Sequence, residues 1–145
     1  MATPVDVEFQ IPAPRETIYA FSGDLVALGR LVPGVVEIEE TDDSRQAVWH
    51  MQIKLGLMKV KQDLMTTILE LEEPSFAKFS CESKDMAMAG TVTLAEAGEG
   101  QTDVTAHFEA EGRGPLARLI DTYMEPKLVE YAKGFSENLQ AKVSS

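Results

Sequence analysis

Hydrophobic and polar residues alternate along most of the chain, and this two-residue period predicts β-strands. The alternation first appears over residues 4–11 and is ended by Pro12. After Pro33 it returns in segments separated by short breaks rich in Gly, Pro, Asp and Ser, and short breaks favour antiparallel neighbours. The six later strands are expected near residues 35–41, 45–55, 58–71, 75–85, 87–96 and 101–111.

Each expected strand has one apolar face and one polar face, as in a sheet that is covered on one side. In the last strand, for example, Asp103, Thr105, His107 and Glu109 occupy the polar face. The apolar face of the later strands comprises Ala47, Trp49, Met51, Ile53, Val60, Leu64, Thr66, Ile68, Ala77, Phe79, Cys81, Met88, Val92, Leu94, Val104, Ala106, Phe108 and Ala110.

Helical periodicity appears in three places. A short helix opens at Pro14, and Asp24 has the side chain of an N-cap for a second one over residues 25–31. The third runs from Pro115 to about Val143, which at helical rise corresponds to roughly 44 Å. Pro126 lies between its two apolar stripes, and a bend there would aim both at the same surface. The stripes comprise Leu116, Leu119, Ile120 and Tyr123, and then Leu128, Tyr131, Phe135 and Leu139. We expect this helix to cover the apolar sheet face.

Composition narrows the class of protein. A chain of 145 residues predicts one domain over residues 1–145, and its net charge of −11 argues against nucleic-acid binding. Cys81 is the one cysteine, so neither an internal disulfide nor a cysteine-based zinc site is expected. The chain has no signal-peptide pattern and no apolar run near the ~20 residues of a membrane span, so we expect a cytoplasmic location.

Four motifs together resemble a known superfamily. They are Phe9-Gln-Ile-Pro-Ala-Pro-Arg-Glu, Leu31-Val-Pro-Gly-Val with Asp24 upstream, Ala89-Gly-Thr-Val-Thr-Leu, and Gly112-Arg-Gly-Pro-Leu-Ala. They resemble the START-like (SRPBCC) proteins, which include the birch pollen allergen and polyketide cyclases. Within that superfamily the chain looks most like the G-subunit family of carbon monoxide dehydrogenase, although it lacks the glycine usual near Lys61-Gln62.

The resemblance implies an α+β helix-grip fold, in which a β-α-α-β6 antiparallel curved sheet wraps around a long C-terminal helix. It also implies a cavity for a hydrophobic or amphiphilic small molecule, no cofactor, and weak membrane association at the inner membrane face. The resemblance to the carbon monoxide dehydrogenase family adds an accessory role in the assembly of a molybdenum hydroxylase.

The inward rows and the helix predict the residues of a ligand cavity: Trp49, Met51, Leu64, Thr66, Phe79, Cys81, Met88, Phe108, Leu119, Ile120, Tyr123 and Tyr131. Loops at one end of the meander are apolar and carry lysines and arginines, whereas the loops at the other end are acidic. The resemblance places the cavity mouth at the apolar end, as a portal formed by Leu31, Val32, Leu55, Leu57, Met86 and Arg113. In the alternative interpretation these loop tips fold back and cap the core.

No catalytic or metal-binding residue is predicted. His50 and His107 fall on the polar face, and Cys81 lies among apolar side chains. Gln62, Thr66, Tyr123 and Tyr131 are the expected interior polar groups, with Lys127 nearby. Three hypotheses follow: a non-enzymatic ligand-binding protein, a polyketide cyclase or dehydratase using Tyr123, Tyr131 or Lys127 as acid or base, and an interaction module with a filled core.

Overall fold

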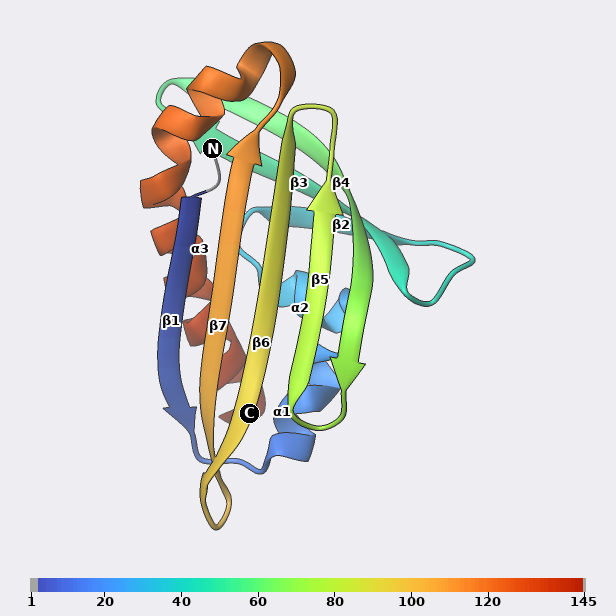
Figure 1. Ribbon diagram of the computed structural model, residues 1–145, viewed down its shortest axis with the longest axis vertical. Helices are drawn as coiled ribbons and strands as arrows, with labels where there is room; N and C mark the ends of the chain where they lie inside the picture. The colour runs from blue at the N-terminus through green and yellow to red at the C-terminus, as the bar shows by residue number, and fades with distance from the viewer. Residues whose placement is uncertain (1–2, 145) are drawn as a thin grey trace.

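The chain forms a strongly curved antiparallel sheet that holds a long helix, as the computed structural model shows (Figure 1). The structure describes residues 3–144, apart from the side chains of Thr3, Leu55 and Glu125. The elements are β1 (Thr3–Ile11), α1 (Arg15–Ser22), α2 (Leu25–Leu31), β2 (Val35–Glu40), β3 (Gln46–Leu55), β4 (Met58–Glu72), β5 (Phe76–Glu82), β6 (Met86–Gly98), β7 (Gln101–Gly112), the 3₁₀ turn η1 (Gly114–Leu116) and α3 (Ala117–Ser144). This arrangement is the predicted helix-grip order.

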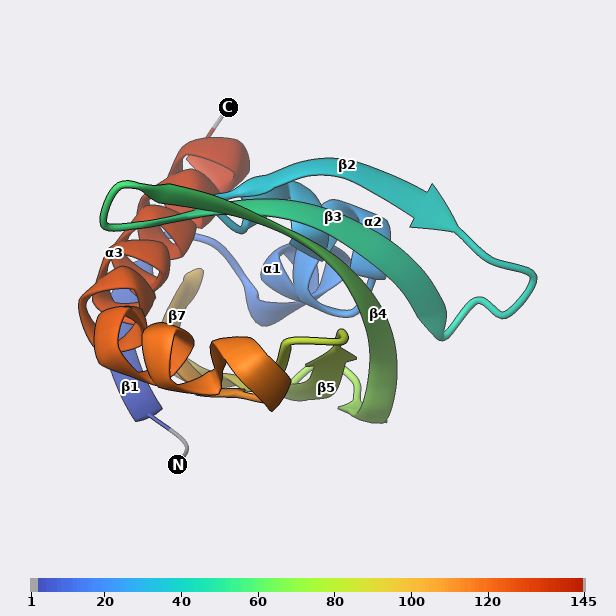
Figure 2. The ribbon, with the colours of Figure 1, turned by 90° about the horizontal axis from the view of Figure 1, so that it is seen from above.

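All seven strands belong to one sheet, in the order β1-β7-β6-β5-β4-β3-β2, and every neighbouring pair is antiparallel. The β3–β4 turn pairs Leu55 with Met58, and Gly56 adopts a φ of +64° there, which glycine tolerates best. Bulges at Val35/Glu37, Ile68/Glu70 and Glu96/Gly98 interrupt the ladders and bend the strands. Figure 2 shows the resulting curve, in which β2, β3 and β4 arch over the helices.

The predicted apolar face is the concave face and forms the core. In β4, for example, the residues from Val60 to Ile68 alternate between buried and more exposed positions. Every residue predicted for the apolar row, which runs from β3 to β7, is buried. A two-residue period therefore located the core correctly, because successive side chains of a strand point to opposite faces.

The helices α1 and α2 cover one part of the concave face. The side chain of Asp24 caps α2, since its Oδ1 accepts hydrogen bonds from the backbone N–H groups of Val26 (2.9 Å) and Ala27 (3.3 Å). Helix α2 lies very close to β3: a Cβ added at Gly29 would lie 2.8 Å from Nε1 of Trp49. The indole N–H of Trp49 in turn donates to the carbonyl oxygen of Leu25.

The long helix α3 packs chiefly against β1 and β7 and more lightly against α2 and β3. It begins at Ala117, two residues later than predicted, because Pro115 belongs to η1. Its axis changes direction along its length (Figure 2), and Pro126 lies inside the helix.

The buried face of α3 differs from the predicted stripes. Its buried apolar row is spaced by four, four, four, three and four residues: Ile120, Met124, Leu128, Ala132, Phe135 and Leu139. Tyr123, expected inside, is 41% exposed, and its neighbour Met124 takes the interior position. Residues spaced by four lie on a line that turns gradually around the helix axis. The buried residues of α3 therefore form one continuous row along the curved sheet, where the sequence had predicted two separate stripes.

Candidate functional site

The interior between the sheet and α3 is rich in methionine and aromatic side chains. Met51, Met86, Met88 and Met124 are all buried there. Trp49 packs against Phe79 with ring centroids 5.8 Å apart, and Phe108 meets Phe135 edge to face at 5.5 Å. These side chains come from both sides of the interior, so the fold places large, adaptable apolar groups against each other.

The structure brings most of the predicted cavity residues together in this interior. Those that are buried are Trp49, Met51, Leu64, Thr66, Phe79, Cys81, Met88, Phe108 and Ile120. Leu119 and Tyr131 are half-buried at its margin, and Tyr123 lies at the surface. Sequence reasoning missed Met86 and Met124 as interior residues, although Met124 fits the helical spacing between Ile120 and Leu128.

The buried polar groups of the interior already have hydrogen-bond partners. The hydroxyl of Thr66 contacts the Leu64 carbonyl oxygen and the Cys81 Sγ, each at 3.3 Å. Burial raises the pKa of the Cys81 thiol to about 12, and the contact with Thr66 opposes this only partly. The Cys81 thiol is therefore neutral near pH 7 and is a poor nucleophile.

A second polar group, Gln62, holds the connection between β5 and β6. Its Nε2 donates to Oδ2 of Asp85 over 3.0 Å, and its Oε1 accepts from the hydroxyl of Ser83. The backbone N–H of Arg113 donates to the Asp85 carbonyl oxygen over 2.6 Å. Residues of β4 and of the segment after β7 thus hold this connection in place over the interior.

The acid–base candidates Tyr123, Lys127 and Tyr131 follow one another at four-residue spacing along α3. The Tyr131 hydroxyl lies beside Gly34, where an added Cβ would be 3.3 Å away. Burial, and secondarily the carboxylate of Glu130, raise the pKa of Tyr131 to about 12, so its hydroxyl stays protonated and can donate a hydrogen bond. Lys127 pairs with Glu130 at 3.2 Å. Tyr123 lies four residues before Lys127 on the same helix and is 41% exposed.

Half of the predicted portal is buried, which contradicts an open mouth at these residues. Leu31, Val32 and Met86 are only 5%, 8% and 0% exposed. The segment after α2 is tied to α3, because Asn138 Nδ2 donates to the Leu31 carbonyl oxygen over 2.9 Å. Pro33 approaches the helix so closely that a Cβ on Gly134 would lie 2.5 Å from its Cγ. Leu31, Val32 and Met86 are therefore part of the packed core.

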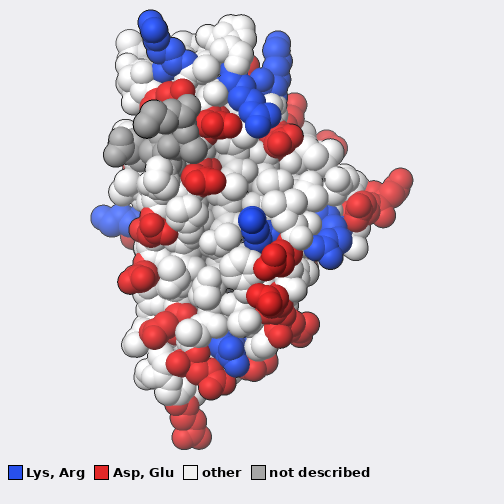
Figure 3. All heavy atoms as spheres, in the orientation of Figure 1, with Lys and Arg blue, Asp and Glu red and all other residues white. Residues whose placement is uncertain are grey.

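The remaining portal residues lie at an exposed and partly cationic end. Leu57 is fully exposed and Met58 is 47% exposed, while the side chain of Leu55, also predicted for the portal, lies outside the described residues. The Arg113 guanidinium lies 3.9 Å from the carboxylates of Glu82 and Glu111. Figure 3 shows Lys and Arg side chains together with carboxylates at the upper end of the molecule, whereas carboxylates dominate the lower end. Of the helices within residues 3–144, none is long and apolar enough to cross a membrane.

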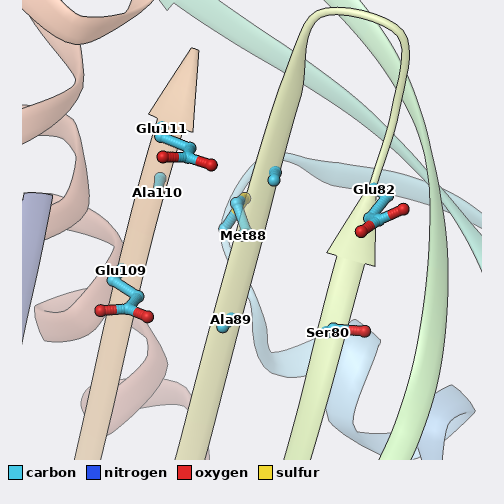
Figure 4. Close-up of a pocket in the computed structure, with 8 residues that line it drawn as sticks. Ser80, Glu82, Met88, Ala89, Glu109, Ala110 and Glu111 are labelled. Carbon is cyan, nitrogen blue, oxygen red and sulfur yellow. The ribbon is translucent and has the colours of Figure 1, made fainter. Parts of the chain in front are cut away.

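A shallow groove of about 260 Å³ lies on the outer face of the sheet, across β5, β6 and β7 (Figure 4). Ala87 and Ala89 leave space at its floor, and the carboxylates of Glu82, Glu109 and Glu111 stand around it. Sequence reasoning missed this groove, although two alanines on the polar face of one strand are a signal for it. Cationic Arg113 lies beside two of its carboxylates.

Both histidines lie on the outer face, as predicted. Nδ1 of His50 lies 2.6 Å from Asp63 Oδ1, and its Nε2 lies 3.1 Å from Glu39 Oε1. The Asp63 contact is the main cause that raises the pKa of His50. His107 contacts Asp6 at 2.7 Å. Among the described side chains, no group of three or more His, Cys, Asp or Glu residues is placed to hold a metal ion.

Comparisons with known proteins agree with this fold. The family model described as polyketide cyclase / dehydrase and lipid transport matches residues 2–144. A conserved protein from Geobacillus kaustophilus superposes with a TM-score of 0.82 at 15% identity, over 99% of this chain and 95% of that one. A START superfamily protein from Mycobacterium smegmatis gives 0.73 at 15% identity, over 97% of each chain. The Zhui aromatase/cyclase from Streptomyces sp. R1128 gives 0.67 at 9% identity, over 99% and 96%. The search of curated proteins gave no match.

Proposed function

Because the chain belongs to the polyketide cyclase / dehydrase and lipid transport family, we propose that it encloses a hydrophobic or amphiphilic small molecule without converting it. The ligand would lie between the concave face of the sheet and α3. The observation that carries this proposal is the group of methionines buried there, namely Met51, Met86, Met88 and Met124.

Methionine suits an interior that must open for a ligand. Its side chain is unbranched and has three rotatable bonds, so it can fill space in one state and move aside in another at low cost. Helix α3 packs chiefly on β1 and β7, whereas Met51, Met86 and Met88 belong to β3 and β6. Flexible methionine side chains are therefore part of the packing between these strands and the helix, and an entering ligand would displace them.

The state of the polar groups supports binding without turnover. Thr66 and Gln62 are engaged in internal hydrogen bonds, and Cys81 and Tyr131 have pKa values near 12. A general acid or base works best with a pKa near the operating pH. These groups are suited to contact a ligand but are poorly tuned for proton transfer.

An enzymatic alternative rests on Tyr131. The Zhui protein is named an aromatase/cyclase. Tyr131 and Lys127 are both half-buried, but the Lys127 ammonium is paired with the Glu130 carboxylate. Its protonated hydroxyl could donate to a substrate carbonyl. Incubation with a linear poly-β-ketone tests this alternative: a cyclised product with wild type, and none with Tyr131→Phe, would replace the non-enzymatic proposal.

Two further roles belong to the proposal. The exposed tip at residues 56–58 supports weak docking on an anionic membrane. Burying a side chain such as Leu57 stabilises an interfacial contact by roughly 1.5–3 kcal/mol, and lysines such as Lys54 and Lys59 add about 1 kcal/mol each.

The accessory role for a molybdenum hydroxylase is supported only by the motifs that resemble the carbon monoxide dehydrogenase family. Co-purification of the tagged chain with such an enzyme tests it.

Native mass spectrometry tests the ligand-binding proposal. We expect gently purified wild-type protein to carry an organic-soluble small molecule or to acquire one from a total lipid extract. A Met88→Leu/Met124→Leu variant conserves volume and polarity, at a cost of less than about 1.5 kcal/mol per site, but removes flexibility. We expect this variant to fold and to show lower occupancy. The matched control is Met65→Leu, which changes a methionine that is 41% exposed on the outer face. A wild-type protein that acquires no small molecule would refute the proposal.

A further inference from the structure

The seven-stranded sheet has two edges that differ in how they are covered. Strand β1 forms one edge and is packed against α3, whereas β2 forms the other and contacts chiefly β3 and α2. Figure 2 shows β2 as the outermost strand of the arch, and no strand within residues 3–144 lies beyond it. An edge strand presents N–H and C=O groups that can pair with an added strand. The β2 edge is therefore a place where an extended segment can join the sheet.

The two faces of β2 differ in chemistry. Residues directly opposite each other in neighbouring strands share a face, and Glu37 pairs with His50 of the outer face. Glu39, two residues further along, lies on that face as well and contacts the His50 ring. Ile38 pairs instead with buried Trp49 and lies on the concave face. Strand β2 is therefore acidic on its outer face and has an apolar residue on the side of α2.

A groove of about 220 Å³ lies between β2 and α2. This volume is below the roughly 300–1,000 Å³ of small-molecule pockets, and it suits the side chains of a peptide instead. The apolar residues Val26, Val35 and Ile38 are half-buried in it. Val36 is 62% exposed, so the groove offers apolar surface that is still in contact with water. The residues that line the groove are Val26, Arg30, Val35, Val36, Glu37, Ile38 and Glu40.

The charges around this edge favour a basic segment. Glu37 and Glu40 line the groove, and Arg30 is the one cation among the lining residues. Within the described part of the chain, Glu37 and Glu40 make no ion pair, whereas Glu39 lies 3.1 Å from Nε2 of His50. Two carboxylates at the edge are thus left to attract cationic side chains of a partner.

A second copy of the chain does not fit the same edge. Strand β2 has the sequence VVEIEE, so antiparallel pairing of two β2 strands would bring the glutamates of the two copies together. Like charges on facing strands are destabilising. Each chain also has a net charge of −11, so two copies repel each other at longer range. The glutamates therefore oppose self-association at this edge but attract a segment of opposite charge.

We propose that the β2 edge binds an extended segment of a partner protein in which apolar residues alternate with Lys or Arg. The segment joins the sheet as an added strand. Its apolar side chains lie in the groove beside α2, and its basic side chains lie on the outer face next to Glu37 and Glu39. This interaction is independent of the interior ligand of the proposed function, because it uses residues at the edge of the sheet.

Two fluorescein-labelled peptides test the charge requirement. The probe is Lys-Val-Lys-Ile-Lys-Val, and Glu-Val-Glu-Ile-Glu-Val has the same apolar residues with the opposite charge. We expect fluorescence anisotropy to show that wild type binds the lysine peptide at least about tenfold more tightly than the glutamate peptide. Equal affinities, or no binding of the lysine peptide up to about 1 mM, would overturn the proposal.

Charge reversal at the edge shows where the peptide binds. Glu37→Lys/Glu39→Lys is expected to weaken the lysine peptide about tenfold and to strengthen the glutamate peptide. The matched control is Glu109→Lys/Glu111→Lys, which makes the same change at the same spacing on β7, a strand that lies between β1 and β6 and borders the outer groove. Equal losses in the two variants would assign binding to net charge, and a loss in the control alone would assign it to the outer groove. Either result would overturn the proposal.

Backbone methylation distinguishes strand addition from adsorption on an acidic surface. The N–H groups of successive residues in a strand face opposite sides, so only alternate ones can reach β2. Two versions of the lysine peptide, N-methylated at odd or at even positions, are therefore compared on wild type. We expect one version to bind at least about tenfold more weakly and the other to stay within about threefold of the unmodified peptide. Equal binding of the two versions would overturn strand addition, whatever the protein variants do.

Hydrogen–deuterium exchange tests the alternative occupant, a second copy. We expect the lysine peptide to slow exchange of the β2 amides, because pairing removes them from water. Without peptide, these amides should exchange equally fast at low and at high protein concentration. Protection that rises with protein concentration alone would assign the edge to a second copy and would overturn the proposal.

Discussion

The indole N–H of Trp49 donates a hydrogen bond to the carbonyl oxygen of Leu25 over 3.1 Å and so joins the middle of β3 to the first residue of α2. Both groups are buried. Trp49→Phe keeps an aromatic ring but leaves this carbonyl oxygen without its donor, and we expect it to lower the free energy of unfolding by about 1–3 kcal/mol. Urea unfolding followed by circular dichroism measures the change. A loss below about 0.5 kcal/mol, which is the scale of a surface substitution, would show that the bond contributes little.

The edge-to-face pair of Phe108 and Phe135 joins β7 to α3 across the core. We expect Phe108→Ala to lower the free energy of unfolding by about 3–5 kcal/mol, because the surrounding core cannot collapse fully into the space. The control Met65→Ala, on the exposed outer face, should cost about 0.5 kcal/mol or less. A small cost for Phe108→Ala would instead indicate that this ring lines a space that opens and refills easily.

His50 predicts a pH dependence of stability. A neutral imidazole has one N–H, so contacts of both ring nitrogens with Asp63 and Glu39 favour the doubly protonated ring, and the pKa of His50 is raised above 6.5. A raised folded-state pKa gives stabilisation that is complete below the unfolded pKa and is lost as the pH rises through the folded value. We expect the melting temperature of wild type to exceed that of His50→Gln most near about pH 6, with a smaller difference near about pH 8. A constant difference across this range would contradict the prediction.

Cys81 is the one cysteine of the chain, so its reactivity can be measured without interference. It is fully buried, and burial raises the pKa of its thiol to about 12. We expect Ellman's reagent to label the native protein near pH 8 only as fast as the structure opens, and to label the urea-unfolded protein at once. Thr66→Val should not accelerate labelling, because desolvation is the main cause of the raised pKa. Fast labelling of native wild type would show that the interior is accessible to polar reagents.

The tip at residues 56–58 predicts membrane binding that depends on two side chains. Leu57→Asp/Met58→Asp should abolish co-sedimentation with vesicles of phosphatidylcholine and phosphatidylglycerol while leaving the melting temperature nearly unchanged, because both residues are exposed. Val36→Asp is the matched control, since Val36 is 62% exposed and belongs to β2, outside the β3–β4 turn. Wild-type protein that does not sediment with these vesicles, or a double variant that still does, would remove the membrane role.

Most of the fold could be predicted from local patterns in the sequence. Alternation located the buried rows of β3 to β7, and Asp24 marked the start of α2, because both depend on geometry within a few residues. The superfamily resemblance was likewise confirmed, whereas the finer assignment to the carbon monoxide dehydrogenase family stays a prediction. The histidines were correctly placed on the outer face for the same reason of parity.

The parts that sequence analysis missed depend on contacts between distant segments. Which side of α3 faces the core depends on how the helix crosses a curved sheet, and apolar residues on several sides of that helix left Tyr123 and Met124 indistinguishable beforehand. The burial of Leu31 and Val32 depends on two contacts between segments about a hundred residues apart. Asn138 donates a hydrogen bond to the Leu31 carbonyl oxygen, and Gly134 has no side chain to block the approach of Pro33.

The sequence by itself therefore determined the strands, the order of elements and the buried rows of β3 to β7, since these follow from side-chain period and local capping. Tertiary structure alone decided the orientation of α3, the burial of Leu31 and Met86 in the core, and the hollow on the outer face across β5, β6 and β7. The physical reason is that a hollow is the space left between packed elements. Its position depends on their relative placement in three dimensions, which no period along the chain encodes.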